Sequence, residues 1–392
     1  MSEMPGEKRL HITYLCNEYP PAPHGGIGSF TQMMARGVVK AGHRASVVGL
    51  YPDGVSGEET DCGVRVLRIA RARTAGLRAC VNGFRLRRAL RALHRTEPID
   101  VLEGQENAFA LLPKAFGPVK VIRMHGGHHF FSVTLGRKPA IWRGWQERRS
   151  FRVADRVCGV SRFVVTLTAE LLGLDAGTIR VLPNPVDSGT FSPQPFVQPE
   201  EGLIVFTGTV CEKKGIRQLI EAMPLVVSRL PQARLEVYGR DARDPATGKS
   251  FTSLLRGMLT PQVAERVQFK GYVPRATLPG ILARAAVCVY PSHMEAMPVA
   301  WLEGLAMGRP VVASAAGPGP EMIEDGVSGL LCDPHDPSSI AECLLRVLTS
   351  RELQARLGEA GRRRVEEWYS LDALVARNVA FYRECLKNGT RP

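Results

Sequence analysis

Short apolar runs rich in β-branched residues alternate with longer stretches of helical periodicity along most of the chain. Strands this apolar are typical of parallel sheets whose two faces are covered by helices. In the first half the predicted strands are His11–Leu15, Ala45–Leu50, Val64–Ile69, Ile99–Glu103, Val119–Met124, Arg156–Val160 and Ile179–Leu182. In the second half they are Leu203–Phe206, Arg234–Tyr238, Val267–Gly271, Ala286–Tyr290 and Pro310–Ala313.

The same pattern indicates the domain organisation. The strand–helix alternation stops at Asp187–Gly202, a proline-punctuated stretch with little apolar periodicity, and then restarts. We therefore predict an α/β protein with two Rossmann-like, doubly wound domains at residues 1–190 and 191–370, and a final amphipathic helix within 371–392. The expected packed face of that helix is Leu374, Val375, Val379, Tyr382 and Leu386. The other predicted helices include Ile27–Ala41, Ser161–Leu172, Ile216–Leu230 and Pro298–Met307.

The composition of the 392 residues, 44% hydrophobic and 23% charged, excludes collagen-like, coiled-coil and disordered chains. None of the nine cysteines forms a Cys-x-x-Cys pair, so we expect reduced thiols and not disulfides or a zinc site. The first ten residues lack the apolar core of a signal peptide, and no run approaches the ~18 apolar residues of a membrane span. These features predict a cytoplasmic protein, either soluble or peripheral on the inner face of the cell membrane.

Positive charge is concentrated in the first half of the chain. The 51 Lys and Arg exceed the 38 Asp and Glu by 13, and residues 1–190 contain 27 basic and 16 acidic residues. Much of this surplus lies in Arg71–Arg95, where apolar residues interleave with eight arginines, and in the Trp- and Arg-rich segment Trp142–Arg152. Such segments suit an anionic membrane surface, and a solvated helix face is the alternative. No nucleic-acid partner is expected, because no binding motif accompanies the charge.

Two loops of the first domain follow predicted strands and carry unusual residues. The first contains Gly25 and Gly26 at the start of a helix, where backbone amides are able to approach an anionic ligand, although the G-x-G-x-x-G spacing is absent. The second contains His125, His128 and His129. No thiol or acid lies at a familiar metal-ligand spacing, so we favour His125 as a hydrogen-bond partner of a substrate hydroxyl. A ligand-free turn and a polar loop are the alternatives.

The second domain has a similar loop after its first predicted strand. Gly208, Thr209, Lys213 and Lys214 lie between that strand and a helix. Ammonium groups at a helix N-terminus suit a diphosphate, although the spacing is not that of a Walker A loop. Solvated loop lysines are the alternative.

Two glutamates follow a later strand of the second domain. Glu295 lies in the loop and Glu303 on the next helix, among apolar neighbours. A carboxylate in such surroundings needs hydrogen-bonding partners, and the hydroxyl groups of a sugar and a ribose would supply them. A helix cap and a surface glutamate are the alternative.

Taken together, these motifs resemble those of family 4 (group 1) retaining glycosyltransferases, which have the GT-B fold of two Rossmann-like domains facing a central cleft. The resemblance covers nearly the whole chain, and its most specific part is the pair Glu295 and Glu303, separated by seven residues. Further matches are Gly25–Gly28, Gly42–His43, Val160–Ser161, Pro183–Asn184, Val186–Asp187, Lys214–Gly215 and Gly319–Glu321.

The resemblance implies a retaining hexosyltransferase that uses a nucleoside-diphosphate sugar and a hydroxyl acceptor, a lipid-linked or growing glycan in cell-envelope or exopolysaccharide synthesis. No cofactor or metal is expected, because a lysine and backbone amides take the metal's place at the diphosphate. The terminal helix is expected to cross back to the first domain. The implied roles are diphosphate binding by Gly25, Gly26 and Lys214, sugar contact by His125 and Glu295, and ribose contact by Glu303.

The sequence departs from the family pattern at two places. Thr209 replaces the usual arginine after the glycine of the second domain, so Lys213 or Arg217 is the candidate source of the missing charge. The usual Asn-Gly is Asn184–Pro185. The open alternatives are an enzyme that glycosylates a soluble small molecule, a nucleotide-sugar epimerase, and a non-enzymatic protein that binds nucleic acid or membranes.

Overall fold

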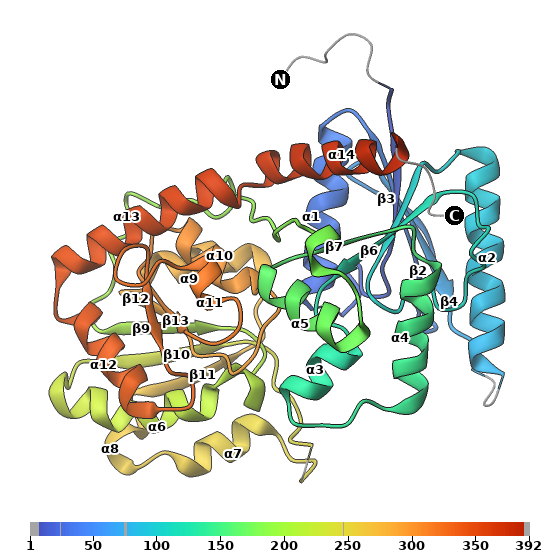
Figure 1. Cartoon of the computed structure of the whole chain (residues 1–392). Coiled ribbons are helices and arrows are strands. Elements are labelled where there is room, and N and C mark those ends of the chain that lie inside the picture. Colours follow the sequence, from blue (N-terminus) through green and yellow to red (C-terminus); the bar gives the residue numbers. More distant parts are fainter. Residues whose placement is uncertain (1–7, 24, 74–76, 246, 388–392) are drawn as a thin grey trace. The chain divides into compact units, whose positions relative to one another are not determined.

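The computed structural model describes residues 8–23, 25–73, 77–245 and 247–387, which form two compact units (Figure 1). Unit 1 contains the described residues up to Pro185 together with the terminal helix α14 (Leu371–Lys387), and unit 2 contains Val186–Ser370. The division lies a few residues before the predicted one at 190. The polar N-terminal segment, His24 of the glycine loop and part of the first basic segment lie outside the described residues.

Unit 1 is built on an eight-stranded sheet with the order β3-β4-β2-β1-β5-β6-β7-β8. Neighbouring strands pair in parallel, except that β3 is antiparallel to β4. The strands are β1 (His11–Leu15), β2 (Arg44–Tyr51), β3 (Gly57–Asp61), β4 (Val64–Ala70), β5 (Val101–Gly104), β6 (Val119–Met124), β7 (Arg156–Gly159) and β8 (Arg180–Val181). The helices before α14 are α1 (Gly26–Lys40), α2 (Arg78–Thr96), α3 (His128–Thr134), α4 (Ile141–Val153) and α5 (Arg162–Leu172), with a 3₁₀ turn η1 (Ala176–Thr178).

Strand β3 was not predicted, because its sequence GEETD has no apolar alternation. It is an exposed edge strand that pairs with β4 across a two-residue turn. Cys62 and Gly63 of that turn have φ angles of 50° and 82°. Positive φ at both positions is typical of type I′ hairpins, so this strand is defined by its turn and its partner and not by its own hydrophobicity.

Helix α14 packs on the core of unit 1. A Cβ atom on Gly37 of α1 would lie 2.5 Å from the side chain of Val375, so the close approach of α1 and α14 requires a glycine there. The predicted packed face is confirmed: Leu374, Val375, Val379 and Tyr382 are buried, and Leu386 packs against the same core.

Unit 2 contains a six-stranded, fully parallel sheet with the order β11-β10-β9-β12-β13-β14. The strands are β9 (Leu203–Thr207), β10 (Arg234–Tyr238), β11 (Val267–Gly271), β12 (Val287–Tyr290), β13 (Val311–Ser314) and the short, unpredicted β14 (Leu330–Cys332). The helices are α6 (Ile216–Arg229), α7 (Phe251–Met258), α8 (Pro261–Ala264), α9 (Leu278–Arg284), α10 (Val299–Ala306), α11 (Gly319–Met322), α12 (Pro337–Leu348) and α13 (Arg351–Trp368), with 3₁₀ turns η2 (Glu212–Lys214) and η3 (Arg275–Thr277).

The two sheets confirm the predicted α/β class with two doubly wound domains. The central strands β9, β12 and β13 are buried along their whole length, which is why their sequences are apolar without alternation. All nine cysteines are unpaired thiols, and six of them are buried. Within the described ranges, no helix combines the length and the apolar character needed to cross a membrane.

Candidate active site

In unit 2, the predicted charged residues lie at the carboxyl ends of neighbouring strands. β9 and β12 pair in parallel, so the loops that follow them lie side by side at the same edge of the sheet. The ammonium group of Lys214, in η2, forms an ion pair with the carboxylate of Glu295, in the loop after β12. Only 20% of the lysine side chain and 10% of the glutamate side chain are exposed. The fold thus joins two motifs that lie about eighty residues apart.

Gly215 fixes the relative position of these two loops. Its φ angle is +64°, and a Cβ atom at this position would lie 1.7 Å from the carbonyl oxygen of Pro291. Only glycine fits such a close approach in this conformation. The backbone N–H of His293 also donates to the carbonyl of Lys213 at 2.9 Å. Lys214 is therefore held at the N-terminus of α6, where the helix dipole favours an anion.

Two lysines near Glu295 favour the ionised form of its carboxyl group. Burial by itself would raise the pKa of this carboxyl. The charges of Lys214 and Lys213 and a hydrogen bond from Ser292 outweigh burial, so the pKa lies below its ordinary value. An ionised carboxylate accepts strong hydrogen bonds from hydroxyl groups.

Glu303, on α10, is buried and has a different partner. Its Oε1 accepts hydrogen bonds from Nε and Nη2 of Arg275, at 3.1 and 2.7 Å. Burial raises the pKa of Glu303, and the Arg275 guanidinium opposes that rise. The sequence analysis did not identify Arg275. The available signal was its position just after β11, at the same carboxyl edge as the other charged residues.

The structure distinguishes between the two candidate substitutes for the missing family arginine. Thr209 is exposed just after β9, and Gly208 before it is partly buried. Arg217 is engaged by Glu212, with Nε to Oε2 at 2.9 Å, and lies over the ring of Phe251. The charge of Lys213, in contrast, contributes to lowering the pKa of Glu295. Lys213 is therefore the better-placed cation.

In unit 1, the glycine loop lies between β1 and α1. Oε1 of Glu18 accepts hydrogen bonds from the N–H groups of Gly25, at 3.2 Å, and Gly28, at 2.8 Å. An acceptor within the chain thus occupies part of the helix N-terminus that the sequence analysis assigned to a ligand, and Glu18 was not identified there. A Cβ atom on Gly26 would have no neighbour within 4 Å, so the backbone at Gly26 is open to close approach.

His125 directly follows β6 at the carboxyl edge of the sheet of unit 1. Its ring packs edge-on against Phe30 of α1, with the ring centroids 4.8 Å apart. Burial lowers the pKa of His125 to about 3, and the Arg123 guanidinium contributes to that decrease. The imidazole is therefore neutral at physiological pH and is not a cation.

The other two histidines of this loop have partners within unit 1. Nε2 of His128 accepts a hydrogen bond from the backbone N–H of Ala140 at 2.8 Å. Nδ1 of His129 contacts the carboxylate of Glu147. Among the residues that the structure describes, no group of three or more His, Cys, Asp or Glu side chains is arranged to hold a metal ion.

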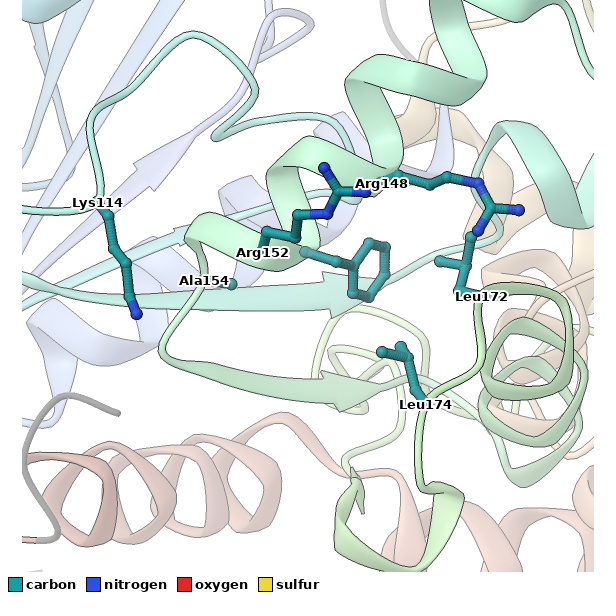
Figure 2. Close-up of a pocket in the computed structure, with 7 residues that line it drawn as sticks. Lys114, Arg148, Arg152, Ala154, Leu172 and Leu174 are labelled. Carbon is teal, nitrogen blue, oxygen red and sulfur yellow. The ribbon is translucent and has the colours of Figure 1, made fainter. Parts of the chain in front are cut away.

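Unit 1 also has a basic surface pocket at the other edge of its sheet (Figure 2). Lys114 lies ahead of β6 and Ala154 ahead of β7, so this pocket lies at the amino ends of the strands, whereas His125 lies at their carboxyl ends. It is therefore separate from the candidate active site. The pocket has a volume of about 330 Å³ and is lined by Lys114, Arg148, Phe151, Arg152, Ala154, Leu172 and Leu174.

Solved structures of glycosyltransferases share this architecture. The structure of sucrose-phosphate synthase from Thermosynechococcus elongatus matches with a TM-score of 0.80 and 21% identity, over 97% of this chain and 100% of that chain. The fold is therefore that of the GT-B glycosyltransferases. Residues 24–189 match the model of glycosyltransferase family 4, and residues 188–364 match that of the group 1 glycosyl transferases. The two models together span residues 24–364, and the chain belongs to the family 4 (group 1) glycosyltransferases.

Two relatives from Mycobacterium tuberculosis align over nearly the whole chain. A glycogen synthase is 24% identical over 98% of this chain and 97% of its own length. A GDP-mannose-dependent alpha-(1-6)-phosphatidylinositol monomannoside mannosyltransferase is 26% identical over 95% of this chain and 98% of its own length.

Proposed function

We propose that this glycosyltransferase is a retaining, metal-independent hexosyltransferase that moves a sugar from a nucleoside diphosphate to a hydroxyl group of a growing glycan or a lipid-linked acceptor. The observation that carries this proposal is the Lys214–Glu295 ion pair at the N-terminus of α6, together with the buried Glu303 on α10. A cation and two carboxylates at one strand edge match the needs of a diphosphate, a sugar and a ribose.

Each group in unit 2 has a role toward the donor. Lys214, assisted by Lys213 and the amides near Gly208 and Thr209, neutralises the diphosphate. Glu295 accepts hydrogen bonds from the hydroxyl groups of the transferred sugar. Glu303 does the same for the ribose, and Arg275 opposes the rise in its pKa that burial causes. These groups stabilise the charge that develops on the leaving diphosphate without a metal ion.

Retention follows from attack on the face that the leaving group vacates. The bond between the anomeric carbon and the phosphate oxygen breaks through an oxocarbenium-like state, and the acceptor oxygen forms the new bond on the same side. The acceptor's proton passes to the departing phosphate oxygen, so no separate general base is needed. From unit 1, we assign a sugar contact to the neutral imidazole of His125 and diphosphate contacts to the backbone at Gly25 and Gly26.

The names of the relatives support these donor and acceptor classes. One relative is named for GDP-mannose and a phosphatidylinositol mannoside, and the other for glycogen. By analogy, we assign this chain to the synthesis of a cell-envelope glycan or an exopolysaccharide.

A screen of UDP-, GDP- and ADP-sugars tests the proposed reaction. We expect one nucleotide to raise the melting temperature of the wild-type protein, and the Lys214→Ala variant to lose that increase. Transfer should continue in the presence of a chelator, and the NMR coupling constant of the anomeric proton should show the donor's configuration in the product. An inverted product, or loss of turnover on chelation, would contradict the proposal.

The basic surface of unit 1 also leads us to propose peripheral docking on an anionic membrane. Helix α2 buries Leu86, Leu90 and Leu93 against its own sheet, so the apolar face that the sequence offered to a membrane is taken up by the core. The exposed apolar side chains left for such a contact include Phe84 of α2, which is 60% exposed, and Ile141 and Trp142 at the start of α4, which are 93% and 55% exposed.

A pocket joins the two basic segments into one surface. Trp142 stacks on Trp145 with ring centroids 5.0 Å apart, and Trp142 and Arg78 line the same pocket. Tryptophan and arginine side by side are typical of surfaces that bind the headgroup region of a membrane. The pocket has a volume of about 460 Å³ and is lined by Leu50, Arg78, Ala79, Asn82, Leu111, Trp142 and Gln146.

The paired substitution Trp142→Ala and Arg78→Ala should weaken binding to anionic liposomes about tenfold, because it removes one interfacial aromatic ring and one charge worth about 1 kcal/mol. Flotation with anionic and neutral liposomes measures this. The matched control is Phe196→Ala, which removes a 97% exposed aromatic ring from unit 2. Equal binding of the wild-type protein to both kinds of liposome would leave the arginines as ordinary solvated surface.

A further inference from the structure

Two buried glutamates meet behind the loop that carries His125. Glu106 lies in the loop after β5 and Glu147 lies on α4, and their exposed fractions are 3% and 0%. Oε1 of Glu106 accepts the backbone N–H of His125 at 2.6 Å. Oε2 of Glu147 accepts the backbone N–H of His129 at 2.9 Å and contacts Nδ1 of the same residue. The pair thus holds the loop at both ends.

The side chains of Glu106 and Glu147 both lie against Gly127. A Cβ atom on this glycine would lie 1.8 Å from Oε1 of Glu147 and 2.9 Å from Cγ of Glu106. Both side chains therefore flank the same backbone atom. Oε1 of Glu147 is buried and has no hydrogen-bond donor among the described residues. A buried carboxylate oxygen without a donor is costly, and a proton on the neighbouring carboxyl group would remove that cost.

The arginines on the elements around Glu106 and Glu147 bind other partners. Arg123 of β6 forms two hydrogen bonds with Glu103, at 2.9 and 3.0 Å. Arg149 of α4 donates to the carbonyl of Ala110 at 2.7 Å. The remaining titratable groups at the pair are the rings of His125, which is neutral, and His129, which faces Glu147. Within the described chain, no cation forms an ion pair with Glu106.

We propose that Glu106 and Glu147 share one proton and act as positioning residues that fix the His125–Gly127 turn. Oε2 of Glu147 is occupied by the backbone N–H and Nδ1 of His129, so Oε1 is the oxygen that is left to accept the proton. Glu106 carries the proton and donates it to the otherwise unpartnered Oε1 of Glu147. The inference rests on the proposed function only for the role of His125, since the shared proton is a property of the fold.

The electrostatics agree with this arrangement. Burial, together with the charge of Glu147, raises the pKa of Glu106 to about 8, against the opposing effect of the backbone N–H groups of Glu106 itself, His125 and Gly126. The proton is then present at neutral pH. Above a pH of about 8, a second negative charge would develop beside Gly127 and push the two carboxylates apart, which would displace the His125 turn.

Infrared spectroscopy of the full chain tests the shared proton directly. The wild-type protein at neutral pH should show the C=O stretch of a protonated carboxyl group, which disappears with a midpoint near pH 8. The Glu106→Gln variant should lack this band. The matched control Glu170→Gln, an exposed glutamate of α5, should keep it. Absence of the band from the wild-type protein, or its presence in Glu106→Gln, would overturn the proposal.

The melting temperature gives a second measurement that does not depend on activity. A carboxyl group with a raised pKa in the folded state stabilises the protein at low pH, and this contribution is lost as the pH rises through the folded-state pKa. The melting temperature of the wild-type protein should therefore fall as the pH rises from the ordinary pKa of 4.5 to about 8 and then level off, and that of Glu106→Gln should fall less. Equal slopes would contradict the proposal. The isosteric Glu147→Gln variant, which keeps an acceptor for His129, should move the infrared midpoint to lower pH.

The pH dependence of kcat tests whether Glu106 and Glu147 position His125. One pH unit above the midpoint, only about a tenth of the molecules keep the proton, so kcat of the wild-type enzyme should fall roughly tenfold there. Glu106→Gln should keep its kcat across the same range, with no change in KM for the donor. An identical alkaline decrease in both proteins would show that the pair does not position His125. If no sugar donor supports turnover, the infrared and melting measurements still decide whether the proton is shared.

Discussion

Replacing Lys214 by alanine should lower the rate of sugar transfer about 100-fold, because one preorganised charge at the leaving group is lost. The ammonium group is the direct partner of Glu295 and lies at the N-terminus of α6. Because Lys214 lowers the pKa of Glu295, its removal should also move the acidic limb of the pH–rate profile to higher pH. Steady-state kinetics over a pH series measure both effects.

The controls separate this effect from a general loss of charge or structure. Arg229→Ala removes an exposed cation from the opposite end of the same helix and should leave the rate unchanged. Glu295→Ala and Glu303→Ala should each reduce transfer at least tenfold. Circular dichroism should show all of these variants to be folded. The site assignment would be refuted if each of the three single variants, Lys214→Ala, Glu295→Ala and Glu303→Ala, kept full activity.

Replacing Arg123 by methionine should destabilise unit 1 by about 3–5 kcal/mol, because it leaves a buried carboxylate without its counter-charge. The guanidinium of Arg123 is 1% exposed and the carboxylate of Glu103 is 3% exposed. Arg123 also donates to the carbonyl of Leu182 at 3.1 Å and to the side chain of Asn378 on α14. The hydroxyl of Tyr382, also on α14, donates to Glu103 at 2.7 Å. The network therefore ties the terminal helix to the sheet.

Urea unfolding, monitored by a probe in unit 1, measures this loss. The matched control is Arg180→Ala, which breaks another ion pair between the sheet and α14, but one whose side chains are 49% and 50% exposed. That variant should lose at most about 1 kcal/mol. The double variant Arg123→Met and Glu103→Leu should recover much of the lost stability, since no unpaired charge stays buried. Equal effects of Arg123→Met and Arg180→Ala would refute the argument from burial.

Most of the fold could be predicted because its signals are local. Buried parallel strands need apolar runs, so β9 and β12 are evident in the sequence, and the break after Asp187 marks the change of domain. Strand β3 could not be predicted from hydrophobicity, because an exposed edge strand needs no apolar face and is specified by its turn. The proximity of the loops around Lys214 and Glu295 could be predicted, because parallel strands present their carboxyl ends at one edge of the sheet.

Side-chain partners could not be predicted, because they depend on distances between segments that are remote in sequence. The leucines of α2 illustrate this: their spacing fits a membrane-binding face equally well, but the sheet of unit 1 covers them. Glu18 is a second case, since a carboxylate seven residues before Gly25 gives no indication that it accepts from that amide. The roles of Arg275, Glu106 and Glu147 could not be predicted either, because their partners lie on other segments of the chain.

By itself, the sequence determined the two-domain α/β fold and the resemblance to glycosyltransferases, from which the candidate donor residues Lys214, Glu295 and Glu303 follow, because hydrophobic periodicity and motif spacing are properties of the chain. The tertiary structure alone decided which charges meet. In the folded chain, Lys214 forms an ion pair with Glu295, Arg275 forms one with Glu303, and Glu106 lies beside Glu147. The reason is physical: a charge acts over a few ångströms of partly dry space, and only the folded chain defines which groups share that space.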